Sequence, residues 1–132
     1  MIINGVELQD IDTLDAIAME RYEAAHDTVY KKLTEYSAEG KRTSEVIRFQ
    51  CETIFEFFET VFGDGTAKKV FGESVNMAIV GKAYGSVVDA VNKHAQNTAA
   101  EYKSQYSNLH NKKQHKQKKK KHYNNRSKSV RK

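Results

Sequence analysis

The sequence contains no proline and no tryptophan, and its single cysteine is Cys51. Because proline is absent, no helix carries a proline kink. One cysteine excludes a disulfide within the chain, and its position among phenylalanines favours a small buried side chain in a reducing compartment. No histidine lies near Cys51 in the sequence, so a catalytic thiol has little support.

Long apolar runs are absent as well. No stretch approaches the roughly 20 apolar residues that a membrane-spanning helix needs, and the first residues do not resemble a signal peptide. We therefore expect a protein without a membrane segment that works in the cytoplasm. With 132 residues, the chain has the length of one domain and can bury a core without disulfide support.

Acidic residues are missing from the last part of the chain. Residues 110–132, which we call the Lys-rich segment, hold eleven of the 22 Lys and Arg residues and none of the 17 Asp and Glu residues. Residues 1–109 therefore carry 17 acidic and eleven basic side chains, a net charge of −6. This asymmetry predicts a boundary near Leu109, with a folded domain over residues 1–109 and a disordered tail over residues 110–132.

The centre of the sequence is aromatic, because all six phenylalanines lie within residues 46–72. Apolar residues recur there at steps of three and four up to Phe62, which predicts an amphipathic helix with a broad apolar stripe. Gly63 and Gly65 are expected to end this helix. A short helix over residues 66–71, ended by Gly72, is predicted to follow.

Two further long helices are predicted, one on each side of this stretch. Apolar periodicity over residues 11–36 predicts the first, capped by Asp10 or Asp12 and ended near Gly40. The same periodicity over residues 77–102 predicts the third, with Ser74 as its cap.

These elements together predict an all-α fold. We expect a small antiparallel bundle of three long helices with a short connector helix and a disordered basic C-terminal tail. Before the first helix, the dipeptide Asn4-Gly5 favours a tight turn in a short extended N-terminal arm or a very small hairpin.

Groups suited to catalysis or metal binding are sparse. Glu52, Glu56 and Glu59 can share one side of the central helix, but carboxylates at such spacings usually belong to a solvated surface. Three of the five histidines lie in the Lys-rich segment, where neighbouring lysines repel a cation. Residues 63–72 lack the GxxxxGK[ST] spacing of a phosphate-binding loop. We therefore expect no catalytic residue, no metal site and no cofactor, in a protein that is not an enzyme.

The Lys-rich segment has two interpretations. Its cations can bind phosphate backbones by releasing counterions, and an aromatic side chain can stack on a base. The other interpretation is a solubilising tail without a ligand. The candidate nucleic-acid contacts are Lys118, Lys119, Lys120, Lys121, Tyr123 and Arg126.

Four motifs in about residues 1–92 belong together. They are the turn at Asn4-Gly5, the ERYE segment at residues 20–23, the FF…FG.GTA.K.FG block at residues 57–72, and Asn76. In this combination the chain resembles a family of small proteins from the tail-gene modules of phages and prophages of Firmicutes. The aromatic block is the most specific part of the resemblance.

The resemblance implies a noncatalytic tail assembly chaperone that holds the tape-measure protein, the tail tube protein or both in the host cytoplasm. A chaperone for a long helical protein needs exposed apolar surface that accepts a helix. Phe49, Phe57 and Phe71 lie at the edges of the predicted stripe and are the candidate partner contacts, with burial in the bundle's own core as the competing use of each. Self-association, and nucleic-acid binding through the Lys-rich segment, are the alternatives.

Overall fold

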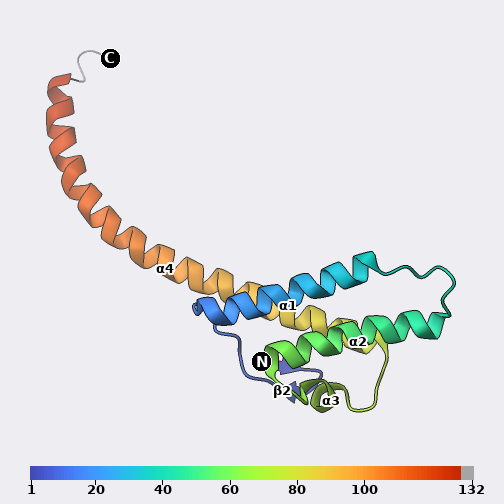
Figure 1. Cartoon of the computed structure of the whole chain (residues 1–132). Coiled ribbons are helices and arrows are strands. Elements are labelled where there is room, and N and C mark those ends of the chain that lie inside the picture. Colours follow the sequence, from blue (N-terminus) through green and yellow to red (C-terminus); the bar gives the residue numbers. More distant parts are fainter. Residues whose placement is uncertain (129–132) are drawn as a thin grey trace. The chain divides into compact units, whose positions relative to one another are not determined.

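The computed structural model describes the backbone of residues 1–128 and the side chains of residues 1–108 (Figure 1). It divides into two compact units, Met1–Ala95 and Gln96–Lys132. The prediction of an all-α fold with three long helices and a short connector helix is confirmed. The elements in chain order are β1 (Ile2–Ile3), β2 (Val6–Glu7), α1 (Ala16–Glu35), α2 (Thr43–Phe62), α3 (Thr66–Phe71) and α4 (Met77–Lys128).

The N-terminal arm is a very small antiparallel hairpin in which Ile2 pairs with Glu7 and Ile3 with Val6. Asn4 and Gly5 form its turn with φ values of 50° and 75°, the left-handed conformation that this dipeptide tolerates best. The Asn4 side-chain amide donates a hydrogen bond to the Val70 carbonyl of α3 (2.9 Å). The predicted turn is therefore present, and it attaches the arm to the folded unit.

The start of α1 differs from the prediction. Asp15 caps the helix, because its side chain accepts a hydrogen bond from the Ala18 amide (3.2 Å). Asp12 instead accepts one from the Leu14 amide (3.0 Å), and Asp10 forms an ion pair with the Met1 ammonium group (2.6 Å). The assignment of the cap to Asp10 or Asp12 is therefore wrong.

Two other predicted helix ends are also corrected. Helix α1 ends at Glu35 with Tyr36 as its C-cap, so Gly40 belongs to the loop that follows. Asn76 caps α4 in place of Ser74, because its side-chain oxygen accepts hydrogen bonds from the amides of Ala78 and Ile79 (2.9 and 3.3 Å). The predicted end of α2 at Gly63 and the predicted bounds of α3 are confirmed.

The core of the first unit collects one buried face from each helix and two residues of the N-terminal arm. Cys51 is 0% exposed, and burial raises the pKa of its thiol, in agreement with the prediction of a small buried side chain. The buried apolar residues are Ile3, Leu8, Tyr22, Ala25, Val29, Cys51, Ile54, Phe57, Phe58, Ala67, Val70, Phe71, Val80, Ala83, Val87 and Val91.

The second unit, Gln96–Lys132, contains the later part of α4. This helix extends to Lys128, and no glycine or proline follows Gly85 in the sequence to end it. Its described side chains, up to residue 108, are mostly exposed, and Tyr102 keeps 61% of its surface accessible. The domain boundary at Leu109 and the disorder of residues 110–132 stay predictions, because the side chains concerned lie outside the described residues.

Candidate partner-binding furrow

Large rings fill the space between α1 and α4. The His26 imidazole stacks between the rings of Tyr22 and Tyr84, with centroids 6.0 and 5.7 Å apart, and Phe57 of α2 meets Tyr84 edge-on at 4.8 Å. We call these four residues the aromatic cluster. Edge-on and stacked ring pairs stabilise a fold by more than the burial of their apolar area alone. These rings fill the space on this side of α1.

One hydrogen bond lies inside the aromatic cluster. The His26 Nδ1 and the Tyr84 hydroxyl are hydrogen-bonded. Burial, with smaller contributions from Tyr22 and Asp27, raises the pKa of Tyr84 to about 12. The phenol therefore stays neutral at physiological pH, and we assign it a structural role rather than that of an acid or base.

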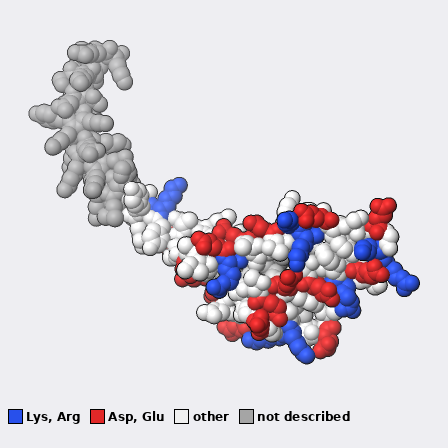
Figure 2. All heavy atoms as spheres, viewed as in Figure 1, with Lys and Arg blue, Asp and Glu red and all other residues white. Residues whose placement is uncertain are grey.

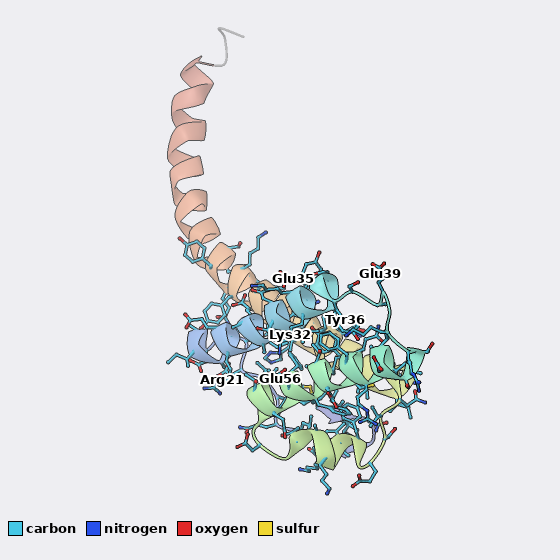
Figure 3. All side chains as sticks on the ribbon, turned by 45° about the vertical axis from the view of Figure 1, so that its right-hand side comes forward. Arg21, Lys32, Glu35, Tyr36, Glu39 and Glu56 are labelled. Atoms are coloured by element: carbon cyan, nitrogen blue, oxygen red, sulfur yellow. The ribbon has the colours of Figure 1, made fainter. Side chains whose placement is uncertain are left out.

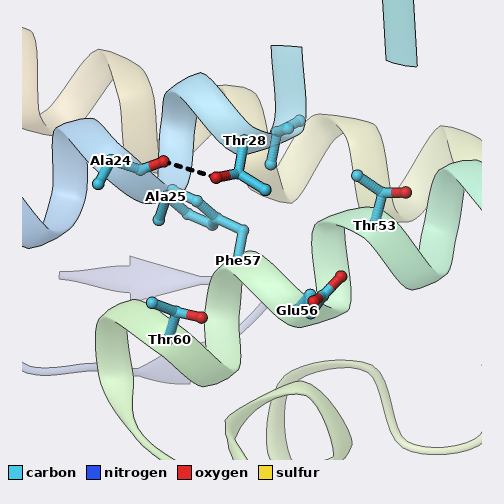
Figure 4. Close-up of a pocket in the computed structure, with 8 residues that line it drawn as sticks. Ala24, Ala25, Thr28, Thr53, Glu56, Phe57 and Thr60 are labelled. Carbon is cyan, nitrogen blue, oxygen red and sulfur yellow. Dashed lines mark hydrogen bonds between the residues drawn. The ribbon is translucent and has the colours of Figure 1, made fainter. Parts of the chain in front are cut away.

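The other side of α1 is open. Between α1 and α2 lies a groove of about 140 Å³ (Figure 4), similar in size to a cavity that accepts a benzene-sized group. Small side chains make its walls and Phe57 contributes to its lining. The lining residues are Ala24, Ala25, Thr28 and Val29 of α1 and Thr53, Glu56, Phe57 and Thr60 of α2.

Two of the three threonines that line the groove donate hydrogen bonds within their own helices. Thr28 donates its hydroxyl proton to the Ala24 carbonyl (2.9 Å) (Figure 4), and Thr53 donates to the Phe49 carbonyl (2.8 Å). Bonding to the carbonyl four residues earlier is a common use of a threonine in a helix. Because these donors are used within their own helices, the groove can cover apolar side chains without leaving those hydroxyls unpaired.

A wider cleft of about 620 Å³ adjoins the groove at Thr60, which lines both. We call the groove and the cleft together the α1–α2 furrow. The cleft is lined by Glu7, Leu8, Gln9, Asp10, Ile11, Asp12, Asp15, Ala18, Arg21, Thr60, Val61, Phe62, Gly63, Thr66 and Lys69.

Charged side chains border the furrow. Lys32 of α1 and Glu56 of α2 form an ion pair beside the groove (2.7 Å), and Figure 3 draws both on the ribbon. Acidic and basic side chains alternate along the face of the first unit seen in Figure 2, with uncharged surface between them. Five of the lining residues are acidic and two, Arg21 and Lys69, are basic.

Comparison with known protein families gives a match over most of the chain. The family described as a family of unknown function (DUF6673) matches residues 4–123. The chain belongs to this family. No curated protein and no solved structure matches the chain. The DUF6673 match includes every residue that lines the furrow and most of the Lys-rich segment.

Within this DUF6673 chain, two of the three candidate partner contacts lie in the core. Phe57 and Phe71 are 2% and 6% exposed, so their placement at the edge of the apolar stripe is wrong. Tyr84 of α4 covers Phe57, and α3 folds back so that Phe71 packs edge-on against Phe58. Phe49 is half-buried and stacks on Tyr36 with centroids 3.9 Å apart, which leaves it as the one partly accessible candidate of the three.

Helix α2 holds four glutamates, and the three considered in the sequence analysis, Glu52, Glu56 and Glu59, have separate partners. Glu56 pairs with Lys32, and Glu52 lies 3.8 Å from Arg48. Glu59 accepts hydrogen bonds from the amides of Gly65 and Ala67 (3.0 and 3.2 Å), and its carboxylate therefore caps the start of α3. This capping role was missed at the sequence level, where Glu59 was assigned to the solvated side of the helix.

The remaining predictions for sites concern the Lys-rich segment and metals. Lys118, Lys119, Lys120, Lys121, Tyr123 and Arg126 lie outside the residues whose side chains are described. Among the described residues no group of three or more His, Cys, Asp or Glu side chains is suited to a metal ion. In the same part of the chain, no helix is both long and apolar enough to cross a membrane.

Proposed function

We propose that this DUF6673 protein is a noncatalytic tail assembly chaperone of a phage or prophage, acting in the host cytoplasm. Its α1–α2 furrow binds an amphipathic helix of the tape-measure protein, with the tail tube protein as the other candidate partner. The observation that carries this proposal is the groove between α1 and α2, lined mostly by small side chains, in which the hydroxyl groups of Thr28 and Thr53 donate to carbonyls of their own helices. The resemblance of the four motifs to those of tail assembly proteins supports the same role.

The shape of the groove suits an aliphatic side chain of a helix. Ala24, Thr28 and Thr60 are small, so an incoming helix can approach closely and insert one anchor side chain toward Phe57. Ile17 lies on the same side of α1, because it is seven residues from Ala24, and it is 66% exposed. An amphipathic partner helix that covers Ile17 and fills the groove gains apolar burial at both places.

A groove-filling substitution tests the proposal. Ala24→Trp places an indole in the groove, whereas Ala16→Trp adds the same side chain at an exposed position on another side of α1. Tagged full-length proteins are purified, with nuclease treatment, from cells that express the accompanying tail genes, and captured proteins are quantified by mass spectrometry. We expect wild type and Ala16→Trp to capture the tape-measure or tail tube protein, and Ala24→Trp to capture roughly tenfold less.

Two results of this experiment oppose the proposal. Wild-type protein that captures neither tail protein argues against the chaperone function itself. Capture by Ala24→Trp at the wild-type level argues against the furrow as the binding site while keeping the function. Circular dichroism melts of the three proteins separate lost binding from lost folding.

Nucleic-acid binding is the second candidate, and the eleven basic residues of the Lys-rich segment favour it. Such binding weakens steeply with salt, because each phosphate contact releases counterions. We therefore expect anisotropy of a labelled single-stranded oligonucleotide to report binding that disappears when Lys118, Lys119, Lys120 and Lys121 are replaced by Glu. The variant Ala24→Trp is the matched control, since it leaves the Lys-rich segment unchanged.

A further inference from the structure

Two parts of the chain carry opposite net charges. Residues 1–109 carry a net charge of −6, and the Lys-rich segment contains eleven basic and no acidic residues. Opposite charges on two surfaces favour their encounter and fix their register. The Lys-rich segment of one copy is therefore opposite in charge to the rest of the chain of another copy.

The carboxylates of the furrow are the most suitable of these surfaces. Asp10 already pairs with the Met1 ammonium group and Glu56 with Lys32. Glu7, Asp12 and Asp15 also line the furrow, and within the described residues they form no ion pair. Three acidic side chains thus line the cleft without an ion pair among the described residues, and the same cleft is also lined by the basic side chains of Arg21 and Lys69.

The cleft also offers apolar surface next to these carboxylates. Ile11, Val61 and Phe62 line it and are half-buried. A lysine can lay its aliphatic stem along such surface while its ammonium group reaches a carboxylate. A peptide rich in lysine, with few large apolar side chains, matches this combination better than a purely apolar helix does.

We infer that the α1–α2 furrow of one copy binds the Lys-rich segment of a second copy. Such binding caps the furrow with the protein's own segment until a tail protein displaces it. The inference shares the furrow with the proposed function, but self-association does not require that the partner is a tail protein. Removing the capping segment is expected to leave the capture of a helical partner intact or to strengthen it.

Two full-length variants remove the two halves of this contact. In the segment variant, Lys118, Lys119, Lys120 and Lys121 are replaced by Glu. In the furrow variant, Glu7→Gln, Asp12→Asn and Asp15→Asn remove three charges, while Asn at residues 12 and 15 keeps the side-chain acceptors that bind the Leu14 and Ala18 amides. Asn caps a helix about as well as Asp, so we expect the furrow variant to fold.

Sedimentation velocity of nuclease-treated protein at low and high salt measures the association. We expect wild type to associate with increasing concentration at low salt and to dissociate at high salt, where charges are screened. Each variant alone is expected to associate at least about tenfold more weakly. An equimolar mixture of the two variants is expected to recover part of the association, because one supplies an intact furrow and the other an intact segment.

Several outcomes overturn the inference. Wild type that is monomeric at every concentration excludes binding between copies. Association that is unchanged in the segment variant shows that another surface is responsible, and association that nuclease abolishes shows that nucleic acid bridges the copies. Each of these results leaves the chaperone proposal standing if Ala24→Trp still loses the tail protein. If instead the copies associate as expected but no tail protein is captured, the chaperone proposal is wrong and the inference stands.

Discussion

The two sides of α1 differ in the size of the side chains that lie between α1 and its neighbouring helices. Toward α4, the aromatic cluster fills the space with three large rings and a stacked imidazole. Toward α2, alanines and threonines leave the furrow. Phe57 takes part in both, because it meets Tyr84 edge-on and also lines the groove. We expect stability to depend mainly on the first side, and under the proposed function partner binding depends on the second.

Removal of the Phe57 ring, which both sides share, is expected to lower the free energy of unfolding more than any other change considered. Phe57 is 2% exposed, so Phe57→Ala leaves a cavity between the aromatic cluster and the groove. We expect the free energy of unfolding to fall by about 3–5 kcal/mol, measured by urea denaturation. Phe49→Ala is the control, since Phe49 is only half-buried, and an equal loss in both variants would contradict the difference between core and surface.

The hydrogen bond inside the aromatic cluster is expected to contribute less to the free energy of unfolding than the Phe57 ring does. Tyr84→Phe keeps the ring but removes the hydroxyl that is hydrogen-bonded to His26. The expected loss is about 1 kcal/mol of unfolding free energy, again by urea denaturation. Tyr30→Phe changes a tyrosine on α1 that is 70% exposed, and it should be neutral. A loss for Tyr30→Phe as large as that for Tyr84→Phe would show that the buried bond is not the cause.

The pH dependence of stability tests the contribution of the Tyr84 hydroxyl in a second way. The pKa of Tyr84 is raised from 10.0 to about 12 in the folded protein, so the unfolded chain loses this proton first as pH rises. The stabilisation is complete below pH 10 and is lost between pH 10 and about 12. We therefore expect the advantage of wild type over Tyr84→Phe to shrink across this window, in urea titrations at each pH. A constant difference would contradict the buried environment of the phenol.

The furrow is expected to tolerate changes that the aromatic cluster does not. Ala24 is exposed, so Ala24→Trp should change the free energy of unfolding by no more than about 0.5 kcal/mol. Thermal and urea denaturation measure this directly. A large destabilisation would mean that the groove closes during folding, and the two sides of α1 would then not differ in the proposed way.

Part of this architecture was predictable from local sequence signals. The Asn4-Gly5 turn and the glycine that ends α2 depend on backbone conformations that few residues adopt. The caps at Asp15 and Asn76 were not predicted, because several residues near each helix start can cap it. The tertiary path of the chain decides which of these residues caps the helix. Asp10 does not, because it pairs with the Met1 ammonium group.

Burial and the furrow were less predictable for a related reason. Helical periodicity gives the neighbours of Phe57 and Phe71 on their own helix but not the elements that cover them. The groove likewise requires Ala24 and Thr28 on one helix to lie opposite Thr60 on another. That register is a tertiary property, so small residues on each helix alone do not predict a hollow between them.

Hydrogen–deuterium exchange of the complex with the captured tail protein, compared with the free protein, is the most direct test of helix binding in the furrow. We expect slower amide exchange in residues 17–28 of α1 and 53–60 of α2, and little change around Tyr84. Unchanged exchange in both furrow segments, with protection elsewhere in the described residues, would contradict binding in the furrow.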